Sequence, residues 1–394
     1  MLKVQYSPLK NYSLLNTKSI KPDTGNETCS NKEIDLNFSS SAVYNVHFGN
    51  RLRVPTKLER YEGCLLGGAI GDAFGAPLEK LSTIEIKYKY KGDLKYLKKQ
   101  KDGLADFTDD TQMTLFTIEG LIGAVGRYSE DSVAFYKKIY NSYQNWYKTQ
   151  FALAPEENAK GLMKIEGLYK QYEPGYTCLT ALKNGEMGTV EHPINNSAGN
   201  GGVMRVAPVG LLYKDDSEKA FSVGMNIAAM THGHPDAYLP AGYFASLITE
   251  ILNGKALEAA IENTNKILAK YPNSEILFEK INLAQKLAKS DLDTKDAIAN
   301  IGSGWTGSEA LAIALYTNLK TPDNYKRVII TAANHDGDSD TTAAIAGNIA
   351  GALNGSINIP KSWTKNIYLS DLLKKYSFFI NQMTEPTGLM SKII

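Results

Sequence analysis

The sequence predicts an all-α protein built as one large domain with an N-terminal extension. Apolar residues recur at helical spacing through most of the chain beyond residue 55, and clear strand-like alternation is scarce. Hydrophobic residues make up 43% and charged residues 22% of the 394 residues, which is typical of a globular protein. One large core can form at this length and no fixed repeat divides the chain, so residues 56–394 are expected to be a single domain.

The first 55 residues differ from the rest of the chain. They are rich in Ser, Asn, Lys and Thr, with weak periodicity and few bulky apolar clusters. Such a composition offers little apolar surface for a core of its own. Residues 1–55 are therefore predicted to be an extension that is flexible, lies along the domain or binds a partner.

From residue 58 onward, helices joined by glycine-rich turns are expected. Each contains apolar or small residues three or four positions apart. The predicted helical segments are 58–74, 111–125, 130–148, two within 217–253, a charged pair within 256–288, 307–316, 325–333 and 341–353. The clearest alternating segment, 84–88, is predicted to be one short strand.

Charge, cysteine content and hydropathy limit the environment and the partners. The formal net charge is +1, so bulk electrostatics favours neither nucleic acid nor an acidic membrane surface. Three widely spaced cysteines form no metal-ligand spacing, which indicates a reducing compartment. The sequence shows no signal-peptide pattern and no apolar run of about 20 residues. A soluble cytoplasmic protein without a nucleic-acid or membrane partner is expected.

A first acidic cluster, Thr108-Asp109-Asp110-Thr111, stands where an apolar helix is expected to begin. Asp and Thr at a helix start commonly cap free backbone N–H groups and complement the positive helix end. Taken by itself, this cluster is explained as well by capping as by metal binding.

A second acidic cluster places Asp336, Asp338 and Asp340 at alternate positions directly before a helix of small residues. Capping needs one of them, and three carboxylates so close together repel one another unless a cation neutralises them. An EF-hand is excluded, because Thr341 stands at its glycine position and Gly347 at its bidentate glutamate. A set of oxygen donors favours Mg²⁺, with Mn²⁺ as an alternative, over zinc.

Glycine-rich segments provide further candidates. Residues 63–75 and 343–352 are rich in Gly and Ala, which would let two helices cross closely and bring the acidic clusters together. Glu79 follows the first of these segments and is interpreted either as a surface residue or as an acid/base beside the metals. The loop 195–205 is either an ordinary turn or a cradle of backbone N–H groups for a phosphate.

Three other motifs have simpler explanations. His232 and His234 do not share a helix face, so a phosphate contact or structural hydrogen bonding is favoured over zinc binding. The GxGxxG pattern at 302–307 lacks a buried strand before it, which argues against a dinucleotide fold. Seven lysines within 87–101 fit a solvated face better than contact with an acidic partner.

Taken together, these motifs resemble the ADP-ribosylglycohydrolase family, which includes the regulatory hydrolase of dinitrogenase reductase. The paired TDDT and GDSDT motifs are the specific part of the similarity, and the glycine-rich segments support it. The matching segments follow the family's order over about residues 58–360 and are 63–79, 107–112, 200–205, 231–233, 302–315 and 335–351.

The resemblance implies a compact all-α fold with two Mg²⁺ ions. The implied ligands are Thr108, Asp109, Asp110, Asp338, Asp340 and Thr341. The residues implied to line a pocket for the diphosphate and ribose are Gly199, Asn200, Gly201, Gly202 and His232. Proton handling falls to Glu79, Asp338 or Asp340. Some members carry a carboxylate in the glycine loop, and residues 195–200 contain none, so the identity of the acid/base stays open.

The resemblance also implies an activity, the release of ADP-ribose from a modified protein side chain, with arginine as the expected linkage. Cleavage of such a bond has oxocarbenium character. Some bacterial members resemble immunity proteins against ADP-ribosylating toxins. Residues 1–55 are therefore expected either to block such a toxin or only to pack on their own domain. A non-catalytic structural or binding protein on the same scaffold, as among certain lens crystallins, is the alternative.

Overall fold

The computed structural model describes residues 53–385, which form an all-helical domain. Sixteen α-helices and four short 3-10 helices occur in this part of the chain, which contains no strand. Isolated β-bridges join Ala105 to Ile367 and Gly199 to Thr306. The predicted all-α class is confirmed. The extension predicted for residues 1–55 lies outside the described residues, apart from its last three.

The predicted helical segments are all present, although their ends differ by a few residues. The structure adds short or amphipathic helices that the sequence patterns did not indicate, including α5, α11, α15 and α16. In chain order the helices are α1 Lys57–Gly75, α2 Thr83–Tyr90, α3 Asp109–Ala124, α4 Val133–Thr149, α5 Tyr176–Lys183, α6 Ala207–Leu212, α7 Ser217–Ala229, α8 Pro235–Leu252, α9 Leu257–Leu268, α10 Glu275–Ala288, α11 Thr294–Ile301, α12 Gly307–Lys320, α13 Tyr325–Ala333, α14 Ser339–Asn354, α15 Lys361–Thr364 and α16 Ser370–Met383.

The strand predicted at 84–88 is wrong, because this segment belongs to helix α2. Ser82 caps the helix, and the Glu85 side chain reaches back to the Ser82 backbone in a capping box. The alternating apolar residues do not share one buried face. Ile86 is fully buried, whereas Ile84 and Tyr88 are 78% and 90% exposed. The local capping signal therefore outweighs the alternation.

The pattern at 302–307 follows a helix, as helix α11 ends directly before it. Gly302 terminates α11 with a φ of 149°, and Gly304 has a φ of 85°. Both values lie in the region that favours glycine. These glycines therefore shape a turn between α11 and α12, and no dinucleotide-binding strand precedes them.

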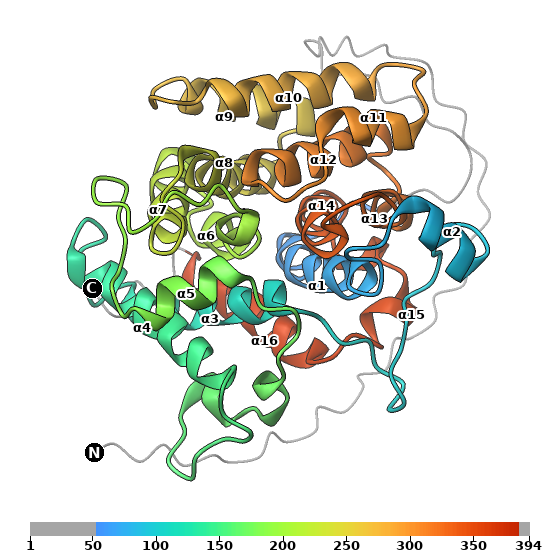
Figure 1. Ribbon diagram of the computed structural model, residues 1–394. Helices are drawn as coiled ribbons and strands as arrows, with labels where there is room; N and C mark the ends of the chain where they lie inside the picture. The colour runs from blue at the N-terminus through green and yellow to red at the C-terminus, as the bar shows by residue number, and fades with distance from the viewer. Residues whose placement is uncertain (1–52, 386–394) are drawn as a thin grey trace, which may run out of the picture. The chain divides into compact units, whose positions relative to one another are not determined.

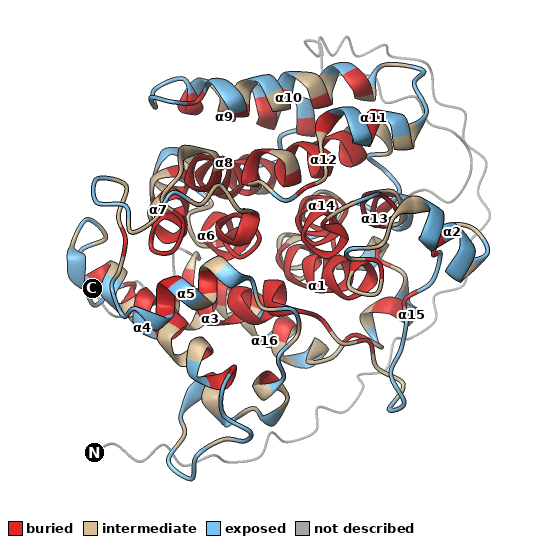
Figure 2. Cartoon of the chain, viewed as in Figure 1, coloured by how far each residue is buried: buried red, intermediate tan, exposed pale blue. Residues whose placement is uncertain are grey.

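Helices α1 and α14 lie side by side and antiparallel at the centre of the domain, where nearly every residue is buried (Figures 1 and 2). Glycines face one another along this contact, and a Cβ built on Gly67 or Gly347 would overlap the carbonyl oxygen of the other. Side chains of α14 and α13 also donate hydrogen bonds to the α1 backbone along this contact. Asn348 donates to Cys64 O at 2.7 Å and Tyr325 donates to Gly67 O at 2.8 Å. The predicted close approach of two small-residue helices is confirmed, although they pack antiparallel along their length and do not cross.

We expect Gly347→Ala to lower the free energy of unfolding by about 1–3 kcal/mol, because the added methyl group must push two backbones apart. Urea unfolding measures this change. Gly123→Ala on α3 is the matched control, since its Cβ would meet only the flexible end of Lys138. That control is expected to be neutral or slightly stabilising. Equal stability of the two variants would contradict the proposed packing constraint.

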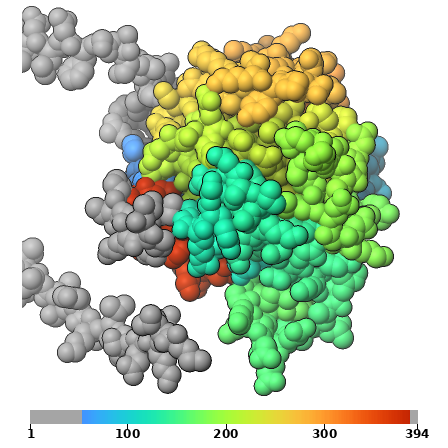
Figure 3. Space-filling view, turned by 90° about the vertical axis from the view of Figure 1, so that its left-hand side faces the viewer, coloured from blue at the N-terminus to red at the C-terminus, as the bar shows by residue number. Residues whose placement is uncertain are grey.

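The remaining helices surround this central pair. Helix α10 packs on α12, and α7 packs on α8. Their outer faces are exposed in Figure 2, notably along α9, α10 and α11. In Figure 3 the teal residues near 130 lie between yellow-green residues above and green residues below. Among residues 53–385, no helix combines the length and apolar character that a membrane span requires.

Candidate active site

The two acidic clusters meet at the starts of α3 and α14, as the sequence predicted. Thr341 Oγ1 donates to Asp110 Oδ1 at 3.2 Å and joins them directly. The capping interpretation is also confirmed for one residue in each cluster. Thr108 caps α3 and Asp338 caps α14. Asp109 and Asp110 are not needed as caps, and Asp340, whose Oδ1 accepts from Thr341 N at 3.0 Å, keeps its second oxygen for other chemistry.

Asp72 on α1 fixes the start of α3, a role that no sequence motif indicated. Its carboxylate accepts from Thr108 N at 2.8 Å, from Thr111 N at 3.0 Å and from Thr111 Oγ1 at 2.6 Å. Burial raises the pKa of Asp72 to about 6, although these hydrogen bonds lower it. Asp72 therefore positions the first cluster from behind.

A pocket of about 220 Å³ opens over these residues. Both clusters contribute to its lining, as do Glu79 and the glycine loop. The lining residues are Glu79, Asp109, Asp110, Glu173, Gly175, Tyr176, Thr177, Cys178, Gly199, Asn200, Gly201, Met204, His232, Trp305, Asp338, Asp340 and Thr341. A larger cavity of about 640 Å³ lies along α4 and residues 151–169, but Glu156 is its one carboxylate. The chemistry is therefore concentrated in the smaller pocket.

Most predicted site residues reach this pocket, but three do not. Thr108 and Gly202 do not line it; a Cβ on Gly202 would meet Ala228, which indicates a packing role. Asp336 is exposed and accepts from Thr83 N, outside the site. The separation of Asp336 from Asp338 follows from Gly337, whose φ of 127° turns the backbone between them.

The pocket carboxylates are nearly inaccessible to solvent. Asp109, Asp338 and Asp340 are each 5% exposed and Asp110 is 3% exposed. Burial and mutual repulsion raise the pKa of Asp109, Asp110 and Asp340 well above the usual range of a carboxyl. Asp110 Oδ2 is buried without a hydrogen-bond partner. These groups therefore lack a positive charge beside them.

A divalent cation fits this donor set, because every candidate ligand is an oxygen. Among the described residues, no group of three or more His, Cys, Asp or Glu side chains is arranged as a ready metal site. Thr341 adds a hydroxyl oxygen to the same pocket, and Asp110 Oδ2 is buried without a hydrogen-bond partner. A divalent cation bound here would supply the compensation that buried charge of one sign requires.

Glu79 lies at the pocket and is not the surface residue of the alternative interpretation. Its side chain is 10% exposed and pairs with Lys80 Nζ at 3.3 Å, while Lys80 also pairs with Glu173 at 2.5 Å. Burial and the charge of Asp338 raise the pKa of Glu79 to about 7. A carboxyl with such a pKa can both donate and accept a proton near neutrality.

The glycine loop is tied to the second acidic cluster through Asn200. Its amide donates to Asp338 Oδ2 and to Gly304 O, each at 2.7 Å. The Asn200 backbone donates to Trp305 O at 3.2 Å, which brings the Trp305 turn to the pocket. Trp305, Tyr176 and Cys178 were not indicated as site residues. Only Trp305 lies in a motif that could have suggested it, the glycine-rich 302–307.

His232 lies beside Gly199 and Gly201, with ring atom Nε2 toward both. Its Nδ1 is 2.8 Å from Thr231 Oγ1, which accepts from Arg205 at 2.7 Å. The Thr231 proton therefore goes to Nδ1 rather than to Ala228 O at 3.5 Å. This arrangement leaves the ring proton on Nε2, facing the pocket. Burial and the charge of Arg205 lower the pKa of His232 to about 3, so the ring stays neutral.

Thr231→Val should free the tautomer of His232 and remove an acceptor from buried Arg205. We expect the free energy of unfolding to fall by about 1–3 kcal/mol, the cost of an unsatisfied buried donor. The ¹⁵N chemical shifts of His232 report the tautomer. Thr231→Ser retains the hydroxyl and should restore both the protonated Nε2 and most of the stability. An unchanged ring spectrum in Thr231→Val would exclude this role of Thr231.

The sequence model of the ADP-ribosylglycohydrolase family matches residues 53–386. This match covers most of the chain. The chain belongs to the ADP-ribosylglycohydrolase family. The predicted family is thereby confirmed, and the coarse chemistry is that of a glycohydrolase.

Named relatives of this family member come from bacteria and animals. An ADP-ribosylarginine hydrolase Tri1 of Serratia proteamaculans is 28% identical over 312 residues, which cover 78% of this chain and 74% of that protein. An ADP-ribosylhydrolase ARH3 of Gallus gallus is 25% identical, covering 78% and 88%. The ADP-ribosyl-[dinitrogen reductase] glycohydrolase of Rhodospirillum rubrum is 24% identical, covering 79% and 92%.

A solved structure supports the fold of this ADP-ribosylglycohydrolase family member. The structure is described as an ADP-ribosylglycohydrolase-related protein complex. It is 23% identical, with a TM-score of 0.55, and covers 84% of this chain and 99% of its own. At this identity the likeness concerns the fold alone.

Proposed function

We propose that this protein is a Mg²⁺-dependent hydrolase that removes ADP-ribose from modified protein side chains, with arginine as the linked residue. The observation that supports this proposal is the pocket that joins both acidic clusters and the glycine loop within a family of glycohydrolases. Two relatives named as ADP-ribosylarginine hydrolases agree with the arginine assignment.

Asp109, Asp110, Asp338, Asp340 and Thr341 would hold two Mg²⁺ ions, with Mn²⁺ as an alternative. Thr108 completes the proposed set, although its side chain caps α3 and accepts from Asp110 N at 3.4 Å. Bound divalent cations would supply Lewis-acid binding of substrate hydroxyls and a water of lowered pKa.

The protein's own groups account for the remaining chemistry. Hydrolysis of an N-glycoside with oxocarbenium character needs a proton for the leaving group and a base for the attacking water. Glu79 lies in the pocket beside the proposed metal ligands and is suited to this exchange. Asp338 and Asp340 lie in the same pocket and are the other proposed proton-handling residues. The loop carboxylate of some relatives is absent here, since amide-bearing Asn200 occupies the loop.

The neutral His232 and the glycine loop would bind the diphosphate and ribose. His232 presents an N–H at Nε2, and the absence of a side chain at Gly201 lets the imidazole pack against the glycine loop. An N–H donor suits phosphate and ribose oxygens and does not act as a base.

An assay with two matched peptides tests the linkage, one carrying ADP-ribose on arginine and the other on serine. We expect ADP-ribose to be released faster from the arginine peptide, and we expect this release to require Mg²⁺. Preference for the serine peptide would overturn the arginine assignment. No release from either peptide would favour the alternative, a non-catalytic structural or binding protein on the same scaffold.

We also propose that the N-terminal arm, residues 1–52, confers immunity to an ADP-ribosyltransferase toxin by binding and blocking it. The supporting observation is that the family match begins at residue 53, which leaves a 52-residue segment rich in Ser, Asn, Lys and Thr before it. Deletion should end at residue 52, because Arg53 pairs with Glu59 and Thr56 caps α1. Loss of affinity for a co-encoded toxin, with hydrolysis retained, is expected. Unchanged affinity would remove the blocking role.

A further inference from the structure

A lysine-rich surface, residues 84–101, adjoins the segment directly before the proposed metal ligand Asp338 and has no role in the function above. Seven lysines lie between residues 87 and 101, and all are exposed. None of them forms an ion pair with a carboxylate in residues 53–385. Residues 84–101 contain two acidic residues: Asp93 pairs with Lys295 of α11 at 2.7 Å, and Glu85 caps α2 by accepting from Ser82 N at 2.8 Å. The segment therefore displays a concentrated positive charge in a chain whose net charge is only +1.

This surface is anchored to the domain and is not a loose loop. Ile86, Leu94 and Leu97 are buried beneath it. Asn334 accepts from Leu94 N at 2.8 Å and donates to Leu94 O at 3.1 Å. Asp336 accepts from Thr83 N at the start of α2. Asn334 and Asp336 both belong to the segment directly before Asp338. Their hydrogen bonds therefore hold the lysine-rich surface next to that segment.

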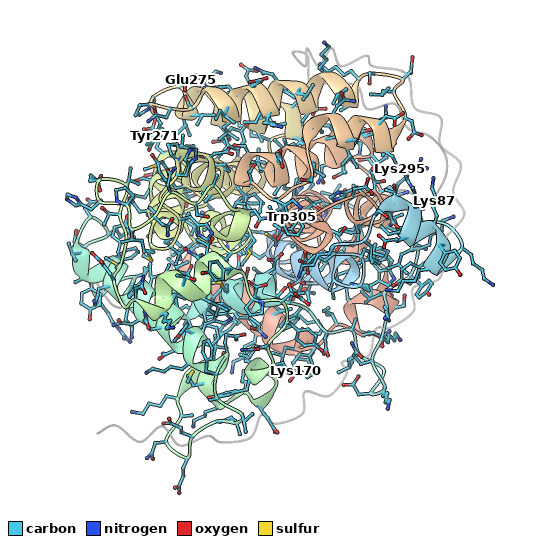
Figure 4. All side chains as sticks on the ribbon, viewed as in Figure 1. Lys87, Lys170, Tyr271, Glu275, Lys295 and Trp305 are labelled. Atoms are coloured by element: carbon cyan, nitrogen blue, oxygen red, sulfur yellow. The ribbon has the colours of Figure 1, made fainter. Side chains whose placement is uncertain are left out.

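Bulky side chains are interspersed among these lysines. Ile84, Tyr88 and Tyr96 are 78%, 90% and 59% exposed. Figure 4 shows Lys87 on α2 and Lys295 on α11 at one edge of the view, with Trp305 of the pocket nearer the centre. Tyrosines are enriched in protein interfaces, where they supply contact area, and charges around them supply specificity and faster association.

We propose that residues 84–101 form a docking surface for acidic segments of the ADP-ribosylated protein, so that the modified side chain reaches the pocket. This inference rests on the proposed function. Its partner is a protein rather than a nucleic acid because the catalysed bond is on a protein and because residues 84–101 contain no arginine, the residue suited to bidentate phosphate contacts. The pocket itself is lined by carboxylates and no lysine or arginine, so the lysine surface serves the protein part of the substrate.

Binding can be measured separately from catalysis. The probes are a fluorescent 20-residue peptide rich in Asp and Glu, the same peptide with Asn and Gln instead, and a single-stranded oligonucleotide of equal charge to the acidic peptide. Fluorescence anisotropy with the full chain should show binding of the acidic peptide, weakening at least about 10-fold between low and high salt. Tighter binding of the oligonucleotide, or equal binding of both peptides, would overturn the proposal.

A charge-reversal variant locates the binding site. Lys87→Glu, Lys91→Glu and Lys95→Glu together should weaken acidic-peptide binding about 10-fold or more, since exposed pairs add only modest energy each. The matched control reverses three exposed lysines without ion pairs in the described residues, Lys255, Lys286 and Lys289, and should bind as the parent does. Equal effects of the two variants would exclude a specific surface.

Kinetics then separates docking from catalysis. With an acidic peptide that carries one ADP-ribosylated arginine, the Lys87, Lys91 and Lys95 variant should raise KM about 10-fold and leave kcat unchanged. Turnover of ADP-ribosylated free arginine should be the same in both proteins. If the parent does not hydrolyse free ADP-ribosyl-arginine, the proposed function fails, whereas the anisotropy result still decides the docking surface.

Discussion

Asp340→Asn is expected to reduce hydrolysis of ADP-ribosylated protein at least about 100-fold, the loss typical when a group stabilising transition-state charge is removed. Asp340 is 5% exposed, lines the pocket and is not required as a helix cap, which Asp338 provides. The substitution keeps the size of the side chain but removes a charge available to a cation. Release of ADP-ribose from a modified peptide at saturating Mg²⁺ measures the effect.

Two controls separate this loss from misfolding. The Asp340→Asn substitution removes a buried carboxyl group that Asp338 and Asp110 repel. The metal-free variant should therefore unfold at the same temperature as the parent or at a higher one. Asp336→Asn, in the same segment but outside the pocket, should retain hydrolysis within about 3-fold. Full activity of Asp340→Asn would exclude this residue from the metal site and from proton handling.

Mg²⁺ should stabilise the protein, and more strongly at pH 8 than at pH 5.5. Asp109, Asp110 and Asp340 have folded-state pKa values raised above the roughly 3.9 of an unfolded aspartate. Over that interval the folded state binds more protons than the unfolded state, so stability of the metal-free protein falls as pH rises. Mg²⁺ neutralises the ionised carboxylates. At 100 times its dissociation constant it should raise the free energy of unfolding by about 2.7 kcal/mol.

Thermal unfolding with and without Mg²⁺ at the two pH values checks this expectation. Asp340→Asn should reduce the Mg²⁺ effect at pH 8, whereas Asp336→Asn should preserve it because Asp336 lies outside the pocket. If Mg²⁺ raised the unfolding temperature equally at pH 5.5 and pH 8, or at neither, the linkage between these carboxylates and the cation would be contradicted.

The all-α class could be predicted from the sequence because the signals that indicate a helix are local. Apolar spacing of three or four residues indicated α1, α3, α4, α7, α8 and α14. The prediction failed at 84–88, where three alternating apolar residues suggested a strand, because the capping box of Ser82 and Glu85, an equally local signal, favours a helix. Helices such as α5 and α16 lacked a distinctive motif and were missed.

The sequence by itself determined the chemical character of the site, namely oxygen donors placed at helix starts and small residues that permit a close approach of two helices. Tertiary structure decided which of these groups act together. It turned Asp336 away from the pocket, buried Glu79, joined Asn200 to Asp338 at 2.7 Å and held the start of α3 with Asp72. The physical reason is that these partners are separated by tens to more than a hundred residues. Their burial and hydrogen bonds exist only after the helices pack.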